Sequence, residues 1–396
     1  GVSLRFDIME SHDNTSAQNG ELVIDADYPG GNVIIEGIEG DLVRLRPDLR
    51  DTTTWWFYWN FRVRGAAGRT ISFAFSGQNP IGVRGPAVST DFGKTWVWLG
   101  TDSVQEGTFR YTFAEDCDEA RFAFTYPYLE ADLQQFLKRH TPRRLIETGE
   151  LCKSSHGRPV EWLQVRSRNA DAQHRVALLC RHHACETMAS FVLEGVLEAA
   201  RSDTPHGQWL REHTHLLAIP FVDKDGVEEG DQGKNRGPHD HNRDYIEHSI
   251  YPEVRAIREF LPRWAEGTLS IGLDLHCPWI RGGSGAPGDN EQVFFVSGPD
   301  EKAWARVQLL ASALESTQTG PIVYSPRYDM PYGVGWNTST GTCAQWLAEQ
   351  AGDPAAAALE FPYANAGGTM VTPETARLFG HDLARAIQIY LEKKDG

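Results

Sequence analysis

The period of the hydrophobic pattern changes once along the chain, near residue 130, and no other feature constrains the fold as strongly. Before this point apolar and polar residues alternate. In residues 54–64 one face carries five large apolar side chains, Trp55, Phe57, Trp59, Phe61 and Val63. Similar short segments follow, with Gly-rich joints between them. This pattern predicts an antiparallel β-sandwich domain over residues 1–126.

Beyond this region the apolar spacing becomes helical. Residues 127–140 place Leu129, Leu133, Phe136 and Leu137 on one helical face, which predicts a helical linker. After it, apolar strands alternate with longer helical patterns. The strands are expected at 175–180, 215–222 and 269–276, and the helices at 187–200, 249–265 and 301–316. Residues 141–396 are therefore expected to form an α/β domain with a largely buried mixed sheet flanked by helices.

Charge and composition exclude several classes of protein. The 396 residues include 38 Lys and Arg against 54 Asp and Glu, so the net charge of −16 disfavours a nucleic-acid partner. No run of 18 apolar residues indicates a membrane span, and the first residues lack the layout of a secretion signal. The six cysteines form no CxxC pair, which favours free thiols and a cytoplasmic location.

Three residues with metal-ligand chemistry follow predicted strands. His183 and Glu186 are three apart just after the strand at 175–180, and His276 ends the strand at 269–276. Taken singly, such residues are more often surface groups, helix caps or hydrogen-bonded core histidines. Together they make the His2Glu set of a catalytic zinc site, in which a fourth position stays open for water.

Two further segments carry unusual polar residues. Glu360 lies in an apolar strand, where an ionised carboxylate is costly unless it is paired or lies near a metal. The Gly-rich loop from 223 to 245 contains Arg236, Asn242 and Arg243 and has no apolar periodicity. We therefore do not expect the loop to be held by a buried apolar face, and its arginines either decorate the surface or bind anions.

The order of these motifs resembles the zinc metallocarboxypeptidases over residues 140–396. The shared order is H-x-x-E, an arginine, N-R, a strand-ending histidine and a late E-x-P. The first 130 residues, with WWFYWNFRV, GQNPIG, GKTWVWLG and YPYLEADLQQFL, resemble the N-terminal β-sandwich of the cytosolic carboxypeptidase branch. The resemblance implies a mixed sheet of the eight-stranded type, and a peptidase that acts on the C-terminus of peptides or proteins.

The resemblance also implies a role for each candidate residue. His183, Glu186 and His276 would hold one zinc ion per chain, and Glu360 would take the proton from a zinc-bound water. Arg236 would stabilise the charge that develops on the carbonyl oxygen. Asn242 and Arg243 would hold the terminal carboxylate of the substrate. Arg281 is a candidate for pairing with an acidic side chain, which would favour acidic C-terminal residues.

The chain departs from the family pattern in two places. His241 stands in HNRDY where the family commonly has an apolar residue. The family spacing places a mobile tyrosine at about Trp336 and Asn337, where this sequence has none; Tyr328 and Tyr332 lie a few residues earlier and receive no catalytic role. His182, His239 and His241 are expected to lie beside the site or at the surface and not to bind the metal.

Two other functions remain open. A zinc amidase or deacylase acting on small N-acyl amino acids would use the same residues. The other alternative is a non-catalytic zinc-containing binding protein, in which the sandwich recruits a partner. The sequence predicts no oligomeric state.

Overall fold

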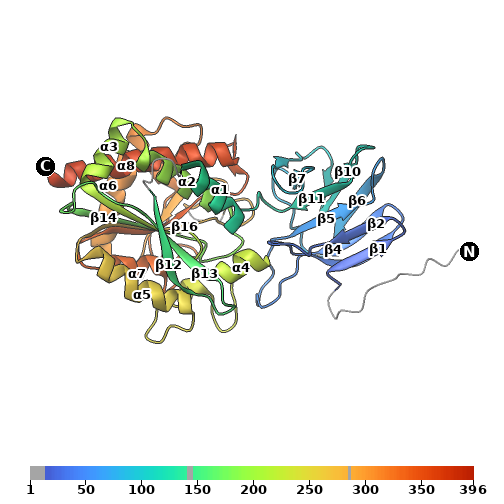
Figure 1. Cartoon of the computed structure of the whole chain (residues 1–396), viewed down its shortest axis with the longest axis horizontal. Helices are drawn as coiled ribbons and strands as arrows, with labels where there is room; N and C mark the ends of the chain where they lie inside the picture. The colour runs from blue at the N-terminus through green and yellow to red at the C-terminus, as the bar shows by residue number, and fades with distance from the viewer. Residues whose placement is uncertain (1–13, 141–145, 284–286) are drawn as a thin grey trace, which may run out of the picture. The chain divides into compact units, whose positions relative to one another are not determined.

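The computed structural model describes residues 14–140, 146–283 and 287–396 (Figure 1). Its contacts group into two units, Gly1–Leu129 with Gly226–Gly237, and Glu130–Asp225 with Pro238–Gly396. The segment 226–237 thus belongs to the first unit, although the sequence pattern placed it in the second domain. The predicted start of the sandwich at 1–13 and the predicted break at 141–144 lie outside the described residues, so the domain limits remain an interpretation.

The first unit contains two β-sheets. The six-stranded sheet has the order β1(Ser16–Asn19), β2(Leu22–Asp25), β5(Asn60–Arg64), β11(Glu119–Ala123), β7(Ala87–Ser89), β8(Val97–Trp98). The five-stranded sheet has the order β3(Ile34–Glu39), β4(Leu42–Arg46), β6(Thr70–Phe75), β10(Thr108–Thr112), β9(Val104–Gln105). Neighbouring strands are antiparallel except β4 and β6, which are parallel. That one pair departs from the expected pattern because β5, which lies between them in the chain, belongs to the other sheet.

Aromatic side chains form the core of the first unit. Trp59, Phe61, Phe73, Phe109 and Phe122 are fully buried, and their rings lie 4.9–5.9 Å apart in successive pairs. These residues come from both sheets, so the alternation in the sequence correctly marked the inward faces.

The predicted strand over 54–64 was wrong in its first half, since β5 begins only at Asn60. Phe57 and Tyr58 are both buried, whereas in a half-buried strand they would point to opposite faces. The backbone N–H of Tyr58 donates to Gln232 Oε1 at 2.8 Å instead of to a neighbouring strand. The segment 226–237 therefore takes the place of a strand partner, which no local pattern indicates.

The second unit is built on a mixed seven-stranded sheet. Its order is β12(Glu147–Lys153), β13(Pro159–Val165), β15(Thr214–Ile219), β14(His174–Cys180), β16(Leu269–His276), β18(Ala355–Glu360), β17(Phe294–Val296). The central strands β15, β14, β16 and β18 are parallel, and the edges are antiparallel. The mixed sheet was predicted correctly, with seven strands among the described residues instead of eight. The short strands β19(Asn365–Ala366) and β20(Thr369–Met370) pair only with each other.

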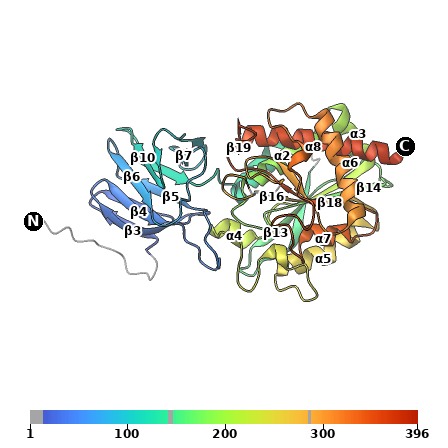
Figure 2. The ribbon, with the colours of Figure 1, turned by 180° about the vertical axis from the view of Figure 1, so that it is seen from behind.

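Helices cover both faces of this sheet (Figures 1 and 2). One layer contains α2(Met188–Arg201), α3(Pro205–His213), α6(Glu301–Thr317) and α8(Pro373–Asp395), and the other contains α5(Pro252–Ala265) and α7(Cys343–Ala348). The remaining helices are α1(Glu130–His140), α4(Lys224–Glu229), η2(His241–Arg243) and η3(Pro326–Tyr328). Gly195 lets α2 cross α8 closely, because a Cβ there would lie 2.1 Å from the carbonyl oxygen of Arg377.

Local sequence signals account for several of these elements. The Thr372 side chain caps α8, and Pro373 occupies its first turn, where no backbone N–H is needed. All six cysteines are free thiols. Among the described residues, no helix combines the length and the apolar composition that a bilayer span needs.

Candidate metal centre and substrate site

The candidate site lies where three neighbouring parallel strands of the second unit end. Cys180, the last residue of β14, is paired in register with Leu275 of β16, and His276 is paired with Glu360 of β18. The carboxyl ends of parallel strands meet at one edge of a sheet, which is where α/β proteins build their sites. The register therefore places His276 and Glu360 side by side, next to the turn that carries His183 and Glu186.

A tight turn between β14 and α2 presents His183 and Glu186. Arg181 has a φ of 63°, a left-handed conformation that is uncommon for a side chain of this kind. Its guanidinium is buried and donates to the carbonyl oxygen of Ala184 at 3.0 Å and to Ser190 Oγ at 3.2 Å. The side chain thus holds the turn in a strained conformation, a feature that clusters at functional sites.

His183, Glu186 and His276 are brought together by this arrangement. One ligand atom from each lies within 4.8 Å of the other two, and each residue is 2% exposed. His183 Nδ1 lies 2.7 Å from Glu186 Oε2, and His276 Nδ1 lies 2.9 Å from Glu186 Oε1. The Nδ1 atoms of both histidines therefore face the carboxylate of Glu186.

The electrostatics of this cluster suit a cation. Burial would raise the pKa of Glu186, but the charges of His183 and His276 hold it well below its ordinary range. Burial would lower the pKa of His276, but Asp274 and Glu186 raise it well above its ordinary value. The carboxylates of Glu186 and Asp274 thus favour a positive charge at this buried site. A divalent zinc ion held by the two imidazoles and the Glu186 carboxylate would supply that charge. The donor set fits zinc.

Each histidine also directs its second ring nitrogen to another carboxylate. His183 Nε2 lies 3.4 Å from Asp240 Oδ2, and His276 Nε2 contacts Asp274 Oδ2. Zinc-binding histidines usually have such a partner, which fixes the tautomer and the ring orientation. The sequence analysis missed both aspartates. Asp274 had a readable signal, because it is a charged residue inside an apolar strand, two positions before His276 on the same face.

The residues expected to hold a carboxylate lie in η2, with Asp240 as its N-cap. Asp240 Oδ1 accepts the backbone N–H of Asn242 at 3.0 Å. Asn242 Oδ1 accepts the backbone N–H of Cys343 at 2.9 Å, and this contact identifies Nδ2 as the donor that Asn242 has to offer. Arg243 donates to the Asn242 carbonyl oxygen at 2.9 Å and to Ser339 Oγ at 3.0 Å.

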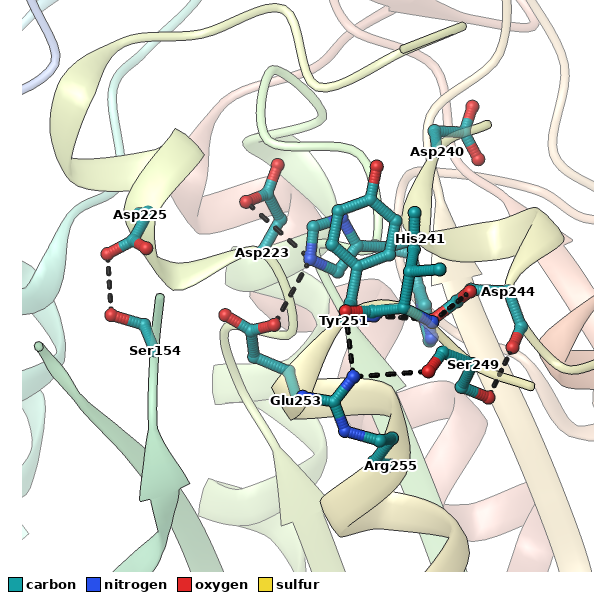
Figure 3. A network of polar contacts seen from close by, with 12 residues as sticks. Ser154, Asp223, Asp225, Asp240, His241, Asp244, Ser249, Tyr251, Glu253 and Arg255 are labelled. Carbon is teal, nitrogen blue, oxygen red and sulfur yellow. Dashed lines mark hydrogen bonds and ion pairs between the residues drawn. The ribbon is translucent and has the colours of Figure 1, made fainter. Parts of the chain in front are cut away.

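His241, the departure from the family pattern, is buried beside this turn. Its Nε2 lies 3.4 Å from Glu253 Oε2 and 3.9 Å from Asp223 Oδ1, and its ring stacks on Tyr251 at 3.8 Å (Figure 3). Figure 3 also shows the separate contacts of Asp244 and Arg255 around Ser249. The polar residue is accommodated by two carboxylates on neighbouring segments, and the turn that bears Asn242 keeps its buried position.

Arg236 is placed in the first unit with the rest of the 226–237 segment. Its Nη2 donates to Asp231 Oδ2 at 3.0 Å, and its Nη1 pairs with Asp51. In this segment Gln232 is fully buried and bonds to the backbone of Asp48 and Tyr58. A polar network therefore holds the loop, which also contains α4, although the sequence pattern predicted no regular structure there.

The other candidate residues lie in loops of the second unit. Arg281 is half-buried after β16, where burial lowers its pKa and Glu291 opposes that effect. Tyr328 is half-buried in η3, with the Arg327 guanidinium over its ring. Tyr332 donates to the carbonyl oxygen of Thr338 at 3.3 Å.

Comparison with known proteins agrees with this geometry. Residues 130–270 match the family model described as zinc carboxypeptidase. This part of the chain is thus similar to the zinc carboxypeptidases. Among curated proteins, the chain is similar to cytosolic carboxypeptidase 2 of Danio rerio, with 31% identity over 181 residues, and to cytosolic carboxypeptidase 6 of Caenorhabditis elegans, with 25% identity over 296 residues.

The coverage of these relatives differs. The match spans 43% of this chain and 25% of the Danio rerio protein, but 67% of this chain and 64% of the Caenorhabditis elegans protein. A metallo-carboxypeptidase structure from Burkholderia cenocepacia has a TM-score of 0.77 at 20% identity, covering 94% of this chain and all of that one. One from Pseudomonas aeruginosa has a TM-score of 0.73 at 20% identity, covering 93% and 99%. Both structures thus share the fold of this chain.

Proposed function

We propose that this protein is a zinc-dependent metallocarboxypeptidase that hydrolyses the C-terminal peptide bond of peptides or proteins. The observation that carries the proposal is the convergence of His183, Glu186 and His276 beside Glu360, from three neighbouring strand ends. Zinc in this set supplies a Lewis acid for the carbonyl group and lowers the pKa of water. We assign one zinc ion to each chain.

Glu360 is the proposed general base. Its register pairing with His276 puts the two side chains on the same side of the sheet, and neighbouring strands lie about 4.8 Å apart. A carboxylate at that distance can accept a proton from the attacking water and pass it to the leaving amine.

Asn242 and Arg243 are the proposed carboxylate-binding pair. The hydrogen bonds from the Arg243 guanidinium to the Asn242 carbonyl oxygen and to Ser339 Oγ use two of its five N–H groups, so donors remain for a substrate carboxylate. Asn242 adds its Nδ2 donor from a turn fixed by Asp240. Recognition of a free carboxylate would make the enzyme an exopeptidase.

The remaining assignments rest on the sequence resemblance. Arg236 is assigned to the charge that develops on the carbonyl oxygen, and its ion pairs with Asp231 and Asp51 would have to loosen for that role. Arg281 is assigned to acidic C-terminal side chains, with part of its charge offset by Glu291. The names of the curated relatives support a cytoplasmic location.

A set of peptides that differ only in the last residue tests the proposal. We expect release of that residue, inhibition by a chelator and recovery with added zinc. C-terminally amidated peptides serve as the control and should be poor substrates. Turnover of N-acyl amino acids without peptide turnover would instead identify a deacylase. Zinc binding without any turnover would identify a binding protein.

A further inference from the structure

A chain of buried polar side chains continues from the proposed metal site into the core of the second unit. Asp274 Oδ2 contacts His276 Nε2, and Asp274 Oδ1 lies 2.8 Å from His182 Nδ1. His182 Nε2 lies 2.8 Å from the hydroxyl oxygen of Tyr245. His182 and Asp274 are fully buried and Tyr245 is 7% exposed. Solvent therefore does not satisfy these groups, and they depend on one another.

The geometry fixes which atom donates at each step. A carboxylate only accepts, so Asp274 takes an N–H from Nδ1 of His182 and from Nε2 of His276. His182 Nε2 then accepts the hydroxyl proton of Tyr245. Because Nε2 of His276 donates to Asp274, Nδ1, which lies 2.9 Å from Glu186 Oε1, is the ring nitrogen that can give up its proton and bind zinc. The hydrogen bonds that begin at Tyr245 thus determine which nitrogen of His276 carries its proton.

The hydrogen bonds to His182 and His276 also fix the orientation of the Asp274 carboxylate. Each carboxylate oxygen has its own imidazole partner, so the group cannot rotate without losing one of them. Removal of His182 would leave Asp274 Oδ1 buried without its donor. That loss frees the carboxylate to turn away from His276.

We propose that His182 and Tyr245 are positioning residues that hold His276, through Asp274, in the tautomer and orientation that bind zinc. This inference rests on the proposed zinc site and deepens it. Neither residue lies among the proposed ligands, and neither contacts substrate in the proposed function. Outer hydrogen-bond partners of this kind typically contribute a factor of about 10 to 100 in metal affinity.

The same residues also meet the geometric condition for a separate metal site. One ligand atom from each of His182, Asp274 and His276 lies within 4.8 Å of the others. The hydrogen bonds argue against that use, because His182 and His276 both direct ring nitrogens at Asp274 as donors. Our proposal predicts one zinc ion for each chain, whereas a second site predicts two.

Three substitutions at His182 separate its two contacts. Asn places an amide donor near the position of Nδ1 and can keep the bond to Asp274. Gln places its amide near the position of Nε2 and can keep only the contact with Tyr245. Leu removes both. The readout is the zinc Kd from chelator competition, together with the visible absorption spectrum of the Co²⁺-substituted protein.

We expect the zinc Kd to rise about 10- to 100-fold in His182→Leu and His182→Gln. His182→Asn should stay within a few-fold of the parent protein, and Tyr245→Phe should show a smaller increase than His182→Leu. His174→Leu is the matched control, because His174, the first residue of β14, is also buried and hydrogen-bonded, but to Ser270 and Asp395. It should leave the zinc Kd unchanged even if it lowers the melting temperature.

The outcomes that overturn the proposal are distinct. An unchanged zinc Kd in a folded His182→Leu protein would refute the positioning role, and so would equal losses in His182→Asn and His182→Gln. Two zinc ions in the parent and one in His182→Leu would favour the second site. A parent protein that binds no zinc would refute the proposed function itself. If His182→Leu does not fold, the comparison of Asn with Gln still decides.

Discussion

Replacement of Glu360 by Gln tests the proposed mechanism most directly. The substitution keeps the size and the strand position of the side chain and removes only the ability to accept a proton. Glu360 is paired in register with His276 and is half-buried, so Gln should fit without disturbing β18. We expect kcat to fall by about 10²- to 10⁴-fold, which corresponds to about 3–5 kcal/mol in the activation barrier.

The assay is release of the last residue from a peptide by the zinc-loaded protein, with zinc content and KM measured on the same sample. Zinc content and KM should stay close to those of the parent, since neither depends on a proton acceptor. Glu194→Gln is the matched control, because Glu194 is also buried in the second unit but pairs with Arg377 at 2.9 Å. If Glu360→Gln retains kcat within about tenfold at full zinc content, the base is another group.

Three other predictions follow from the structure. Arg243→Ala should raise KM for peptides with a free C-terminus far more than for amidated ones, and an equal effect on both would rule out the carboxylate-binding role. His276→Ala should abolish the one bound zinc, as metal analysis would show, and retained zinc would place the site elsewhere. Burial raises the pKa of Asp329 from 3.8 to about 7, against hydrogen bonds from Tyr324 and Phe295. The folded state thus binds this proton more tightly, and the free energy of unfolding should fall by up to about 4 kcal/mol as the pH rises from 4 to above 7. Urea unfolding of Asp329→Asn should lack this part of the pH dependence, and an unchanged profile would contradict the assignment.

The strand-end residues could be read from the sequence because their signals are local. The apolar run that ends at His276 matches β16 without error, and the run that contains Glu360 matches β18. A buried parallel strand is a short continuous apolar segment, so a polar residue at its end stands out. The convergence of His183, Glu186 and His276 was an inference from chemistry, and the structure brings their ligand atoms together.

What local pattern could not provide was the partner of each polar side chain. Tyr58 pairs with Gln232 across 174 residues, and His182 pairs with Asp274 across 92. The alternation in residues 54–64 therefore predicted too long a strand, and the sequence left open whether His182 lies beside the metal site or at the surface. The sequence by itself determined which segments are apolar and in what period, because burial of each segment depends on its own side chains. Only the tertiary structure decided which donors meet which acceptors, because a hydrogen bond depends on two groups whose approach is set by the whole fold.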